Sequence, residues 1–151
     1  MSDWLKEVEP LTLKGQISVP YTWWAGDIAS RFFYALRDEQ KFLGTRCPMC
    51  RKIFVPPRKN CSHCFVDMEE WVEVSDEGVI EAYTIVHYAH PVQPLEPPFA
   101  YAIIKLDGAD VGFLHLIKKD LDKITNGSRV KAKFKTDRTA EILDIDSFEL
   151  I

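Results

Sequence analysis

The sequence predicts a mainly β protein with an N-terminal helical segment, and three observations support that fold class. All four cysteines of the 151-residue chain fall between residues 47 and 64, in two Cys-x-x-Cys pairs. A helical apolar repeat precedes them, and short runs of alternating apolar and polar residues, separated by turn signals, follow them. The predicted order is therefore an arm and helix (residues 1–40), a zinc ribbon (41–70) and a barrel domain with an OB-fold (71–151).

The first predicted segment is an extended arm over residues 1–23. Two prolines and a glycine interrupt scattered apolar residues that show no sustained period, a pattern typical of a chain that lies along another surface. Three tryptophans give the region apolar ends: Trp4, Trp23 and Trp24. We expect them to cap the protein's own core, with contact to another subunit as the alternative.

The second predicted segment is a helix that begins at Asp27 and ends near Gln40. Asp27 is suited to the N-cap, and the apolar stripe that follows has four-residue spacing. This stripe consists of Ile28, Phe32 and Leu36, with Phe33 beside them. Its neighbour is expected to be either the ribbon and the domain behind it or a partner protein. The candidate partner-contact residues are Trp23, Trp24, Phe32, Phe33 and Leu36.

The ribbon is predicted to bind one metal ion through Cys47, Cys50, Cys61 and Cys64. Two Cys-x-x-Cys pairs present four thiolates to one tetrahedral ion, and zinc is the favoured occupant. Iron is the rival, but iron knuckles usually carry glycine after the second cysteine, where this chain has Arg51 and Phe65. Two disulfides are disfavoured, because the chain starts without a signal-peptide pattern. With four protein ligands, the metal is expected to be structural.

Strand predictions cover most of the remaining chain. The ribbon strands are expected at residues 41–46 and 53–55, and the barrel strands at 71–74, 79–88, 100–106, 111–116, 129–135 and 141–148. A short helix is expected at 118–125, where Leu121 and Ile124 stand on a polar background. A run of five or six strands with one helix between the third and fourth is the order expected of an OB-fold, so this pattern favours that fold. The proline-rich loop 87–98 is expected to be stiff and to project between two strands.

Composition and motifs argue against several function classes. No apolar run has the length of a membrane span, and a cytoplasmic location is expected. The net charge of -4 argues against bulk attraction to nucleic acid. No Gly-x-Ser-x-Gly motif or phosphate-binding glycine loop occurs, and the four histidines are interpreted as knuckle, loop or core-edge residues. The chain is therefore not expected to be an enzyme by itself.

One predicted strand carries a stripe of cations. Arg129, Lys131, Lys133 and Lys135 alternate with Val130, Ala132 and Phe134. A period of two places the cations on one face and the apolar residues in the barrel. The cationic face is expected to be simply solvated; the functional alternative is attraction to phosphate, either of a nucleic-acid backbone or of coenzyme A.

Several stretches of the chain resemble a known family. They are residues 31–36 (Arg-Phe-Phe-Tyr-Ala-Leu), 44–50 (Gly-Thr-Arg-Cys-Pro-Met-Cys), 55–58 (Val-Pro-Pro-Arg), 61–64 (Cys-Ser-His-Cys) and 77–80 (Glu-Gly-Val-Ile). Together they are similar to the acyl-CoA-associated family with a rubredoxin-like zinc ribbon plus an OB-fold, long catalogued as domain of unknown function number thirty-five. The resemblance runs from about residue 24 to the C-terminus. The arm has no counterpart in it, and Arg51 and Phe65 depart from the usual knuckle glycines.

The resemblance implies a non-catalytic helper that forms a hetero-oligomer with a thiolase-superfamily enzyme. Such proteins help to hold acyl-CoA or to pass it between active sites, so acyl-CoA is expected to be shared with the partner. The candidate CoA-binding residues are Arg129, Lys131 and Lys133. The alternative function is a single-stranded nucleic-acid-binding module, because zinc ribbons and OB-folds both serve that purpose.

Overall fold

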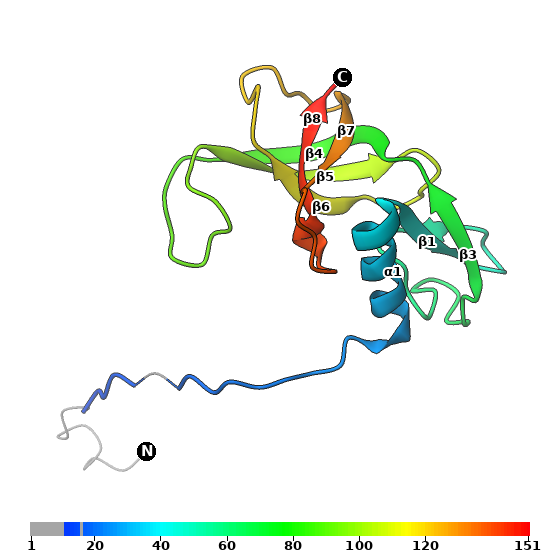
Figure 1. Cartoon of the computed structure of the whole chain (residues 1–151), viewed down its shortest axis with the longest axis horizontal. Helices are drawn as coiled ribbons and strands as arrows, with labels where there is room; N and C mark the ends of the chain where they lie inside the picture. The colour runs from blue at the N-terminus through cyan, green and yellow to red at the C-terminus, as the bar shows by residue number, and fades with distance from the viewer. Residues whose placement is uncertain (1–10, 16) are drawn as a thin grey trace, which may run out of the picture.

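The computed structural model describes residues 11–15 and 17–151. Its elements are, in chain order, helix α1 (Gly26–Glu39), strands β1 (Phe42–Arg46), β2 (Ile53–Phe54), β3 (Glu70–Val74), β4 (Glu77–Val86), β5 (Phe99–Leu106), β6 (Phe113–Ile117) and β7 (Arg129–Phe134), the short 3-10 helix η2 (Ile142–Asp144) and strand β8 (Ile145–Leu150). Figure 1 shows α1 and the small sheet of β1 to β3 beside the larger β4 to β8 unit, with the arm extending away from both.

Strands β4 to β8 form a closed barrel in the order β4-β5-β6-β8-β7. All pairs are antiparallel except β6 with β8, which is the pairing that closes a Greek-key OB-fold. β4 pairs with both β5 and β7, and Gly78 takes part in both pairings, opposite Leu106 of β5 and Val130 of β7. A Cβ atom at Gly78 would lie 2.3 Å from the carbonyl oxygen of Lys105, so only glycine fits. The predicted fold class is confirmed.

The strand at 71–74, predicted as the first barrel strand, lies instead in the ribbon sheet. This sheet has the order β2-β1-β3, and β3 pairs with β1 along its whole length, from Phe42 opposite Val74 to Arg46 opposite Glu70. β2 contributes only two residues to the other side of β1. β3 therefore supplies most of the hydrogen-bonding partners that β1 requires.

The segment 118–125, predicted as a short helix, forms turns. Asp120 has a left-handed backbone (φ 52°), which ends any helix at that point. The N–H of Lys123 donates to the Asp120 carbonyl (2.9 Å), and the N–H of Ser128 donates to the Thr125 carbonyl (3.0 Å). Ile124 is nevertheless buried in the core. The pattern thus identifies the apolar residues of the segment but not their local geometry.

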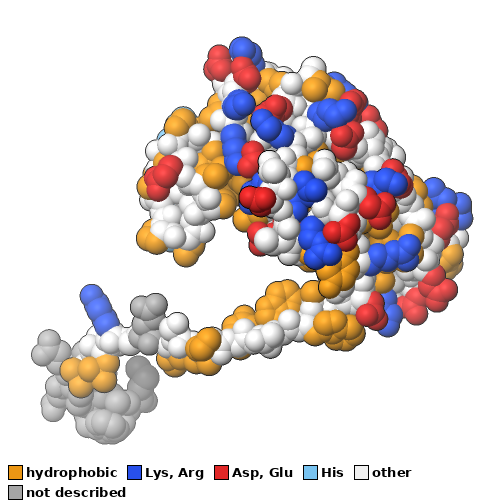
Figure 2. Space-filling model, viewed as in Figure 1, with side chains coloured by type: hydrophobic (Ala, Val, Ile, Leu, Met, Phe, Trp, Pro, Cys, Tyr) orange, Lys and Arg blue, Asp and Glu red, His pale blue; other side chains and the backbone are white. Residues whose placement is uncertain are grey.

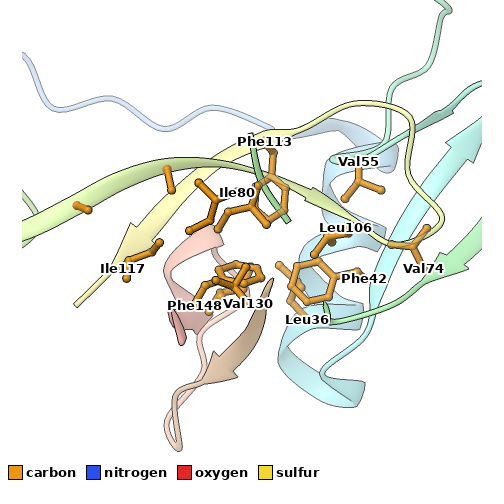
Figure 3. Packing of buried hydrophobic residues seen from close by; sticks show 14 of the residues in the cluster. Leu36, Phe42, Val55, Val74, Ile80, Leu106, Phe113, Ile117, Val130 and Phe148 are labelled. Carbon is orange, nitrogen blue, oxygen red and sulfur yellow. The ribbon is translucent and has the colours of Figure 1, made fainter. Parts of the chain in front are cut away.

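One hydrophobic core joins the helix, the ribbon and the barrel (Figure 3). Phe42, on ribbon strand β1, is 0% exposed and contacts three barrel aromatics. Its ring centroid lies 6.1 Å from Phe113, 5.7 Å from Phe134 and 6.2 Å from Phe148. Leu36 of α1 belongs to the same cluster. The helix and the ribbon therefore close one end of the barrel.

The two ends of α1 are held differently. Asp27 lies in the first turn and not at the N-cap as predicted; Ala25 occupies the N-cap and has no capping side-chain hydrogen bond. At the other end, the Arg138 guanidinium donates to the Arg37 carbonyl (2.6 Å) and to the Lys135 carbonyl (2.7 Å). A barrel loop thus satisfies a helix C-terminal carbonyl that has no partner within the helix.

The described part of the arm, residues 11–15 and 17–25, is extended and exposed. Figure 2 shows its apolar side chains standing clear of the body of the protein. Trp23 and Trp24 therefore do not cap this chain's own core as expected, and Trp4 lies outside the described residues. Over the described residues, no helix has the length and apolar character needed to cross a membrane.

Candidate metal centre and contact surfaces

The four cysteines meet at one point of the ribbon. Their Sγ atoms all lie within 4.8 Å of one another, with Cys47 and Cys61 buried and Cys50 and Cys64 half-buried. A tetrahedral ion with metal–sulfur bonds of about 2.3 Å requires sulfurs about 3.8 Å apart. The distance between the Cys50 and Cys61 sulfurs is 3.8 Å. The side chains therefore fit a four-coordinate metal with no position left for water.

Each Cys-x-x-Cys pair forms a tight turn that directs backbone N–H groups at sulfur. The N–H of Cys50 lies 3.4 Å from the Cys47 sulfur, and the N–H of Cys64 lies 3.4 Å from the Cys61 sulfur. These hydrogen bonds favour the thiolate.

The residues after the two pairs have a left-handed backbone, at φ 64° for Arg51 and φ 58° for Phe65. Their N–H groups donate to the carbonyls of Cys47 (3.0 Å) and Cys61 (2.9 Å). The chain thus reaches the usual knuckle shape without glycine. The missing glycines consequently give no reason to prefer zinc over iron.

Two of the four thiols, Cys47 and Cys64, differ in their tendency to ionise. Burial alone would raise the pKa of Cys47, but hydrogen bonds from the backbone of Cys50 and Met49 and from neighbouring thiols lower it to about 6. Burial, together with the neighbouring sulfurs, raises the pKa of Cys64 to about 12. A bound divalent cation removes this difference, because coordination requires all four sulfurs as thiolates.

The predicted cations on β7 are already paired with carboxylates. Arg129 lies 2.7 Å from Asp107, Lys131 lies 3.1 Å from Glu77, and Lys133 lies 3.0 Å from Glu149. Accordingly, the neighbouring carboxylates, chiefly by hydrogen bonding, raise the pKa of each of these three cations. The alternation itself is confirmed, since Val130, Ala132 and Phe134 pack in the core. This face therefore offers phosphate little net positive charge, and among the described residues no aromatic ring stacks on its cations.

The candidate partner-contact residues fall into two groups. Phe32 and Leu36 are 1% and 0% exposed, so they pack in this chain's own core and are not accessible to a partner. The helical stripe faces inward because the barrel end and the ribbon cover it. Phe33 is half-buried against the same core, whereas Trp23 and Trp24 are exposed.

A hollow of about 580 Å³ lies between the start of α1 and the ribbon. Its lining includes Trp24, Ile28, Lys59, Met68 and Trp71. The guanidinium of Arg31 lies 4.3 Å from the Trp71 ring centre, which fixes the helix against β3. Sequence reasoning missed this site because it assigns Trp71 to the barrel. The pairing of β3 with β1 places Trp71 in the ribbon sheet, where it lines the hollow together with Trp24.

The four histidines are placed as expected, apart from one detail. His63, His87 and His90 are exposed, and His115 is buried on β6. Nε2 of His115 lies 3.3 Å from the Ile142 carbonyl oxygen, whereas Nδ1 is buried without a hydrogen-bond partner among the described residues. Burial lowers the pKa of His115, although the hydrogen bond to Ile142 opposes that effect.

Comparison with known proteins agrees with this geometry. Two family models match the chain: "ChsH2, rubredoxin-like zinc ribbon domain" over residues 35–69, and "ChsH2, C-terminal OB-fold domain" over residues 71–135. A solved protein of unknown function from the DUF35 family of Sulfolobus solfataricus is 31% identical, with a TM-score of 0.59. The match covers 71% of this chain and 78% of that one. This chain belongs to the DUF35 family.

Other relatives of this DUF35 chain are more distant. A "DUF35 domain-containing scaffold protein" of Methanocaldococcus jannaschii is 29% identical over 73 residues, 48% of this chain and 52% of that protein. A "Probable enoyl-CoA hydratase alpha subunit" of Thermomonospora curvata is 27% identical over 100 residues, 66% of this chain and 31% of that protein. The chain thus spans about half, or less, of these curated relatives.

A solved structure of an "Ltp2-ChsH2(DUF35) aldolase" shares the fold. Its TM-score is 0.56 at 22% identity, and the match covers 83% of this chain and 94% of that one.

Proposed function

We propose that this chain is a non-catalytic accessory subunit of a thiolase-superfamily enzyme. It scaffolds the complex and binds or channels the acyl-CoA that the enzyme uses. Zinc, held by Cys47, Cys50, Cys61 and Cys64, keeps the ribbon folded and takes no part in chemistry. Metal-binding cysteine pairs are typical of a reducing compartment, so the cytoplasm is the proposed location.

The observation that carries this proposal is the exposed apolar surface at the start of α1. Trp23 and Trp24 are 70% and 76% exposed, and Trp24 lines the hollow that contains Trp71. Soluble monomers rarely leave large neighbouring apolar side chains uncovered, and tryptophan is enriched among residues that dominate binding energies. This part of the molecule is therefore suited to contact a partner.

The names of the relatives support the same class of function. The Methanocaldococcus jannaschii relative is called a scaffold protein, and the name of the solved aldolase joins ChsH2(DUF35) to a second protein, Ltp2. The Thermomonospora curvata relative is named as an enoyl-CoA hydratase subunit, which suggests a coenzyme A thioester as the shared compound. The thiolase-type partner comes from the resemblance of the motifs around the ribbon.

Two surfaces are candidates for contact with acyl-CoA. The hollow has a volume within the range of small-molecule sites, and it combines Trp24 and Trp71 with the cation Lys59. The cations Arg129, Lys131 and Lys133 are the other candidate, but they would have to exchange their carboxylate partners for phosphate. The hollow is itself lined by the carboxylates of Asp27, Asp67 and Glu69, so neither surface offers phosphate an excess of positive charge and binding measurements on variants have to separate them.

Isolation of the complex tests the proposal. The tagged full chain is purified from its native host, and the proteins that accompany it are identified by mass spectrometry. We expect a thiolase-superfamily protein in a fixed ratio to this chain. Its turnover and its acyl-CoA affinity are then measured with and without the chain. An unchanged rate and affinity would refute the accessory role.

Matched variants of the complex separate the two acyl-CoA surfaces. Lys59→Gln should weaken acyl-CoA binding if the hollow is used, whereas Lys131→Gln should leave it unchanged. Weaker binding in Lys131→Gln with unchanged binding in Lys59→Gln would instead assign the coenzyme A contact to β7. Strong binding of single-stranded DNA at about 150 mM salt would instead favour the nucleic-acid alternative, because non-specific binding there is typically no tighter than about micromolar.

A further inference from the structure

The arm carries a regular apolar repeat, contrary to the expectation that its apolar residues have no sustained period. From Leu11 to Trp23, every odd position except Gly15 is apolar, and every even position is polar or proline. The apolar residues are Leu11, Leu13, Ile17, Val19, Tyr21 and Trp23. A period of two places all of them on one face of an extended chain. The glycine and the proline at position 20 obscure this alternation.

The same residues are uncovered in the structure. Each of the six apolar side chains is between 65% and 90% exposed, and they follow one another along the arm in Figure 2. Backbone hydrogen bonds from residues 11–15 and 17–25 to the rest of the described chain are absent. The arm thus has an unpaired backbone and one apolar face, the two features of a strand without its sheet.

Pro20 determines which backbone edge can pair. In an extended strand, the N–H and C=O groups of odd residues point to one edge and those of even residues to the other. Pro20 has no N–H and lies on the even edge, where it prevents continuous pairing. The odd edge is free of proline from 11 to 23. The arm is therefore built to join a sheet as an outermost strand, bonded through its odd residues.

A second copy of this chain offers no suitable sheet edge within the described residues. The barrel is closed, so its strands have no free edge. On the ribbon sheet, β2 has two residues and β3 has five. β3 also carries Glu70 and Glu73, which pair with Arg46 and Lys41 and would oppose burial of that edge. Thirteen arm residues span roughly 40 Å, far more than either strand.

We propose that the arm binds the partner enzyme by strand addition, as an edge strand on an open β-sheet of that enzyme. Its odd-numbered backbone groups pair with the partner's edge strand, and its odd-numbered side chains fill an apolar groove beside that strand. This inference rests on the proposed function for the existence of a partner, but the mode of contact is independent of acyl-CoA. The partner's recognisable chemistry is an unpaired sheet edge flanked by apolar side chains.

Paired substitutions in the full chain test the face and the edge separately. The probe is the thiolase-superfamily protein recovered with the wild-type chain. Ile17→Asp should weaken binding at least about tenfold, while Ser18→Asp, on the other face, should change it by less than about twofold. Gly15→Pro removes an odd N–H and no side chain, so it should also weaken binding about tenfold or more. Ser18→Pro removes an N–H from the edge that already contains Pro20, and it should have little effect.

Hydrogen exchange in the complex gives a second readout. The N–H groups of odd residues between 11 and 23 should become protected, and those of even residues should continue to exchange. If wild-type chain binds the enzyme and all four variants bind equally well, strand addition is wrong while the accessory role stands. If wild-type chain binds no thiolase-superfamily protein, both proposals fail. Self-association that depends on Ile17 would also overturn the inference, in favour of a second copy as host.

Discussion

Replacement of Phe42 by alanine should destabilise the ribbon and the barrel together. The side chain is 0% exposed and lies about 6 Å, centroid to centroid, from the rings of Phe113, Phe134 and Phe148. Truncation of a buried phenylalanine costs about 3 to 5 kcal/mol, and the lost aromatic pairs place this site near the upper limit. Since domains of this size have free energies of unfolding of about 5 to 15 kcal/mol, the variant should be close to unfolding.

Urea unfolding of the metal-loaded protein measures this effect with two probes. Far-ultraviolet circular dichroism reports mainly on the barrel, and reaction of the four thiols with a chromogenic reagent reports on the ribbon. Both transitions should coincide in the wild type, because one core spans both parts. Both should move to lower urea in Phe42→Ala. Phe65→Ala is the control: Phe65 is 85% exposed, and its loss should change stability by less than about 0.5 kcal/mol.

Two results would refute this reasoning. A loss below about 1 kcal/mol in Phe42→Ala would mean that the site collapses around the missing ring or that the ring is not packed as described. Separate transitions for the thiols and the circular dichroism signal in the wild type would mean that the ribbon and the barrel unfold independently, so that Phe42 does not couple them.

Three further predictions follow from the geometry. Wild-type protein should contain about one metal ion per chain by elemental analysis, and Cys61→Ser should lose this ion and expose the remaining thiols. Metal retained in Cys61→Ser would contradict the ligand set. Asp144 accepts the N–H groups of Thr139 (2.8 Å), Ala140 (2.8 Å) and Glu141 (3.2 Å), so Asp144→Asn should lower urea stability by about 2 kcal/mol, while Asp122→Asn at an exposed site should not. Burial lowers the pKa of His115 from 6.5, so the stabilisation from the buried neutral imidazole is complete above about pH 6.5 and is lost as the pH falls. The free energy of unfolding of His115→Leu should therefore depend less on pH than that of the wild type, and an identical pH slope would contradict this role of His115.

The parts of the fold that depend on local pattern were predictable from the sequence. The spacing of the cysteines identified the metal site, because each pair is a turn whose shape depends on neighbouring residues alone. The four-residue spacing of Ile28, Phe32 and Leu36 identified α1. The strict alternation after Arg129 identified β7 and the side that faces the core. In the helix and the strand, the period of the apolar residues reports directly on backbone geometry.

The parts that depend on pairing between distant segments were not predictable in this way. Alternation marks β3 as a strand, but it carries no information that its neighbour is β1. The cations of β7 could be counted, but their carboxylate partners come from β4, β8 and the turn after β5, so their charge was overestimated. The neighbour of the α1 stripe stayed open between this chain's own domains and a partner for the same reason, because the ribbon and the barrel end that bury it come together only in the folded chain.

The left-handed backbone at Arg51 and Phe65 affects how readily the ribbon gives up its metal. A side chain in that conformation costs about 1 to 2 kcal/mol at each position, which glycine would not incur. In a ribbon whose shape is completed by metal binding, this cost is subtracted from the binding free energy. Each residue therefore weakens the retention of the ion by roughly tenfold. This ribbon should exchange its metal with a chelator faster than its Arg51→Gly and Phe65→Gly variants, so the centre would be structural and yet labile.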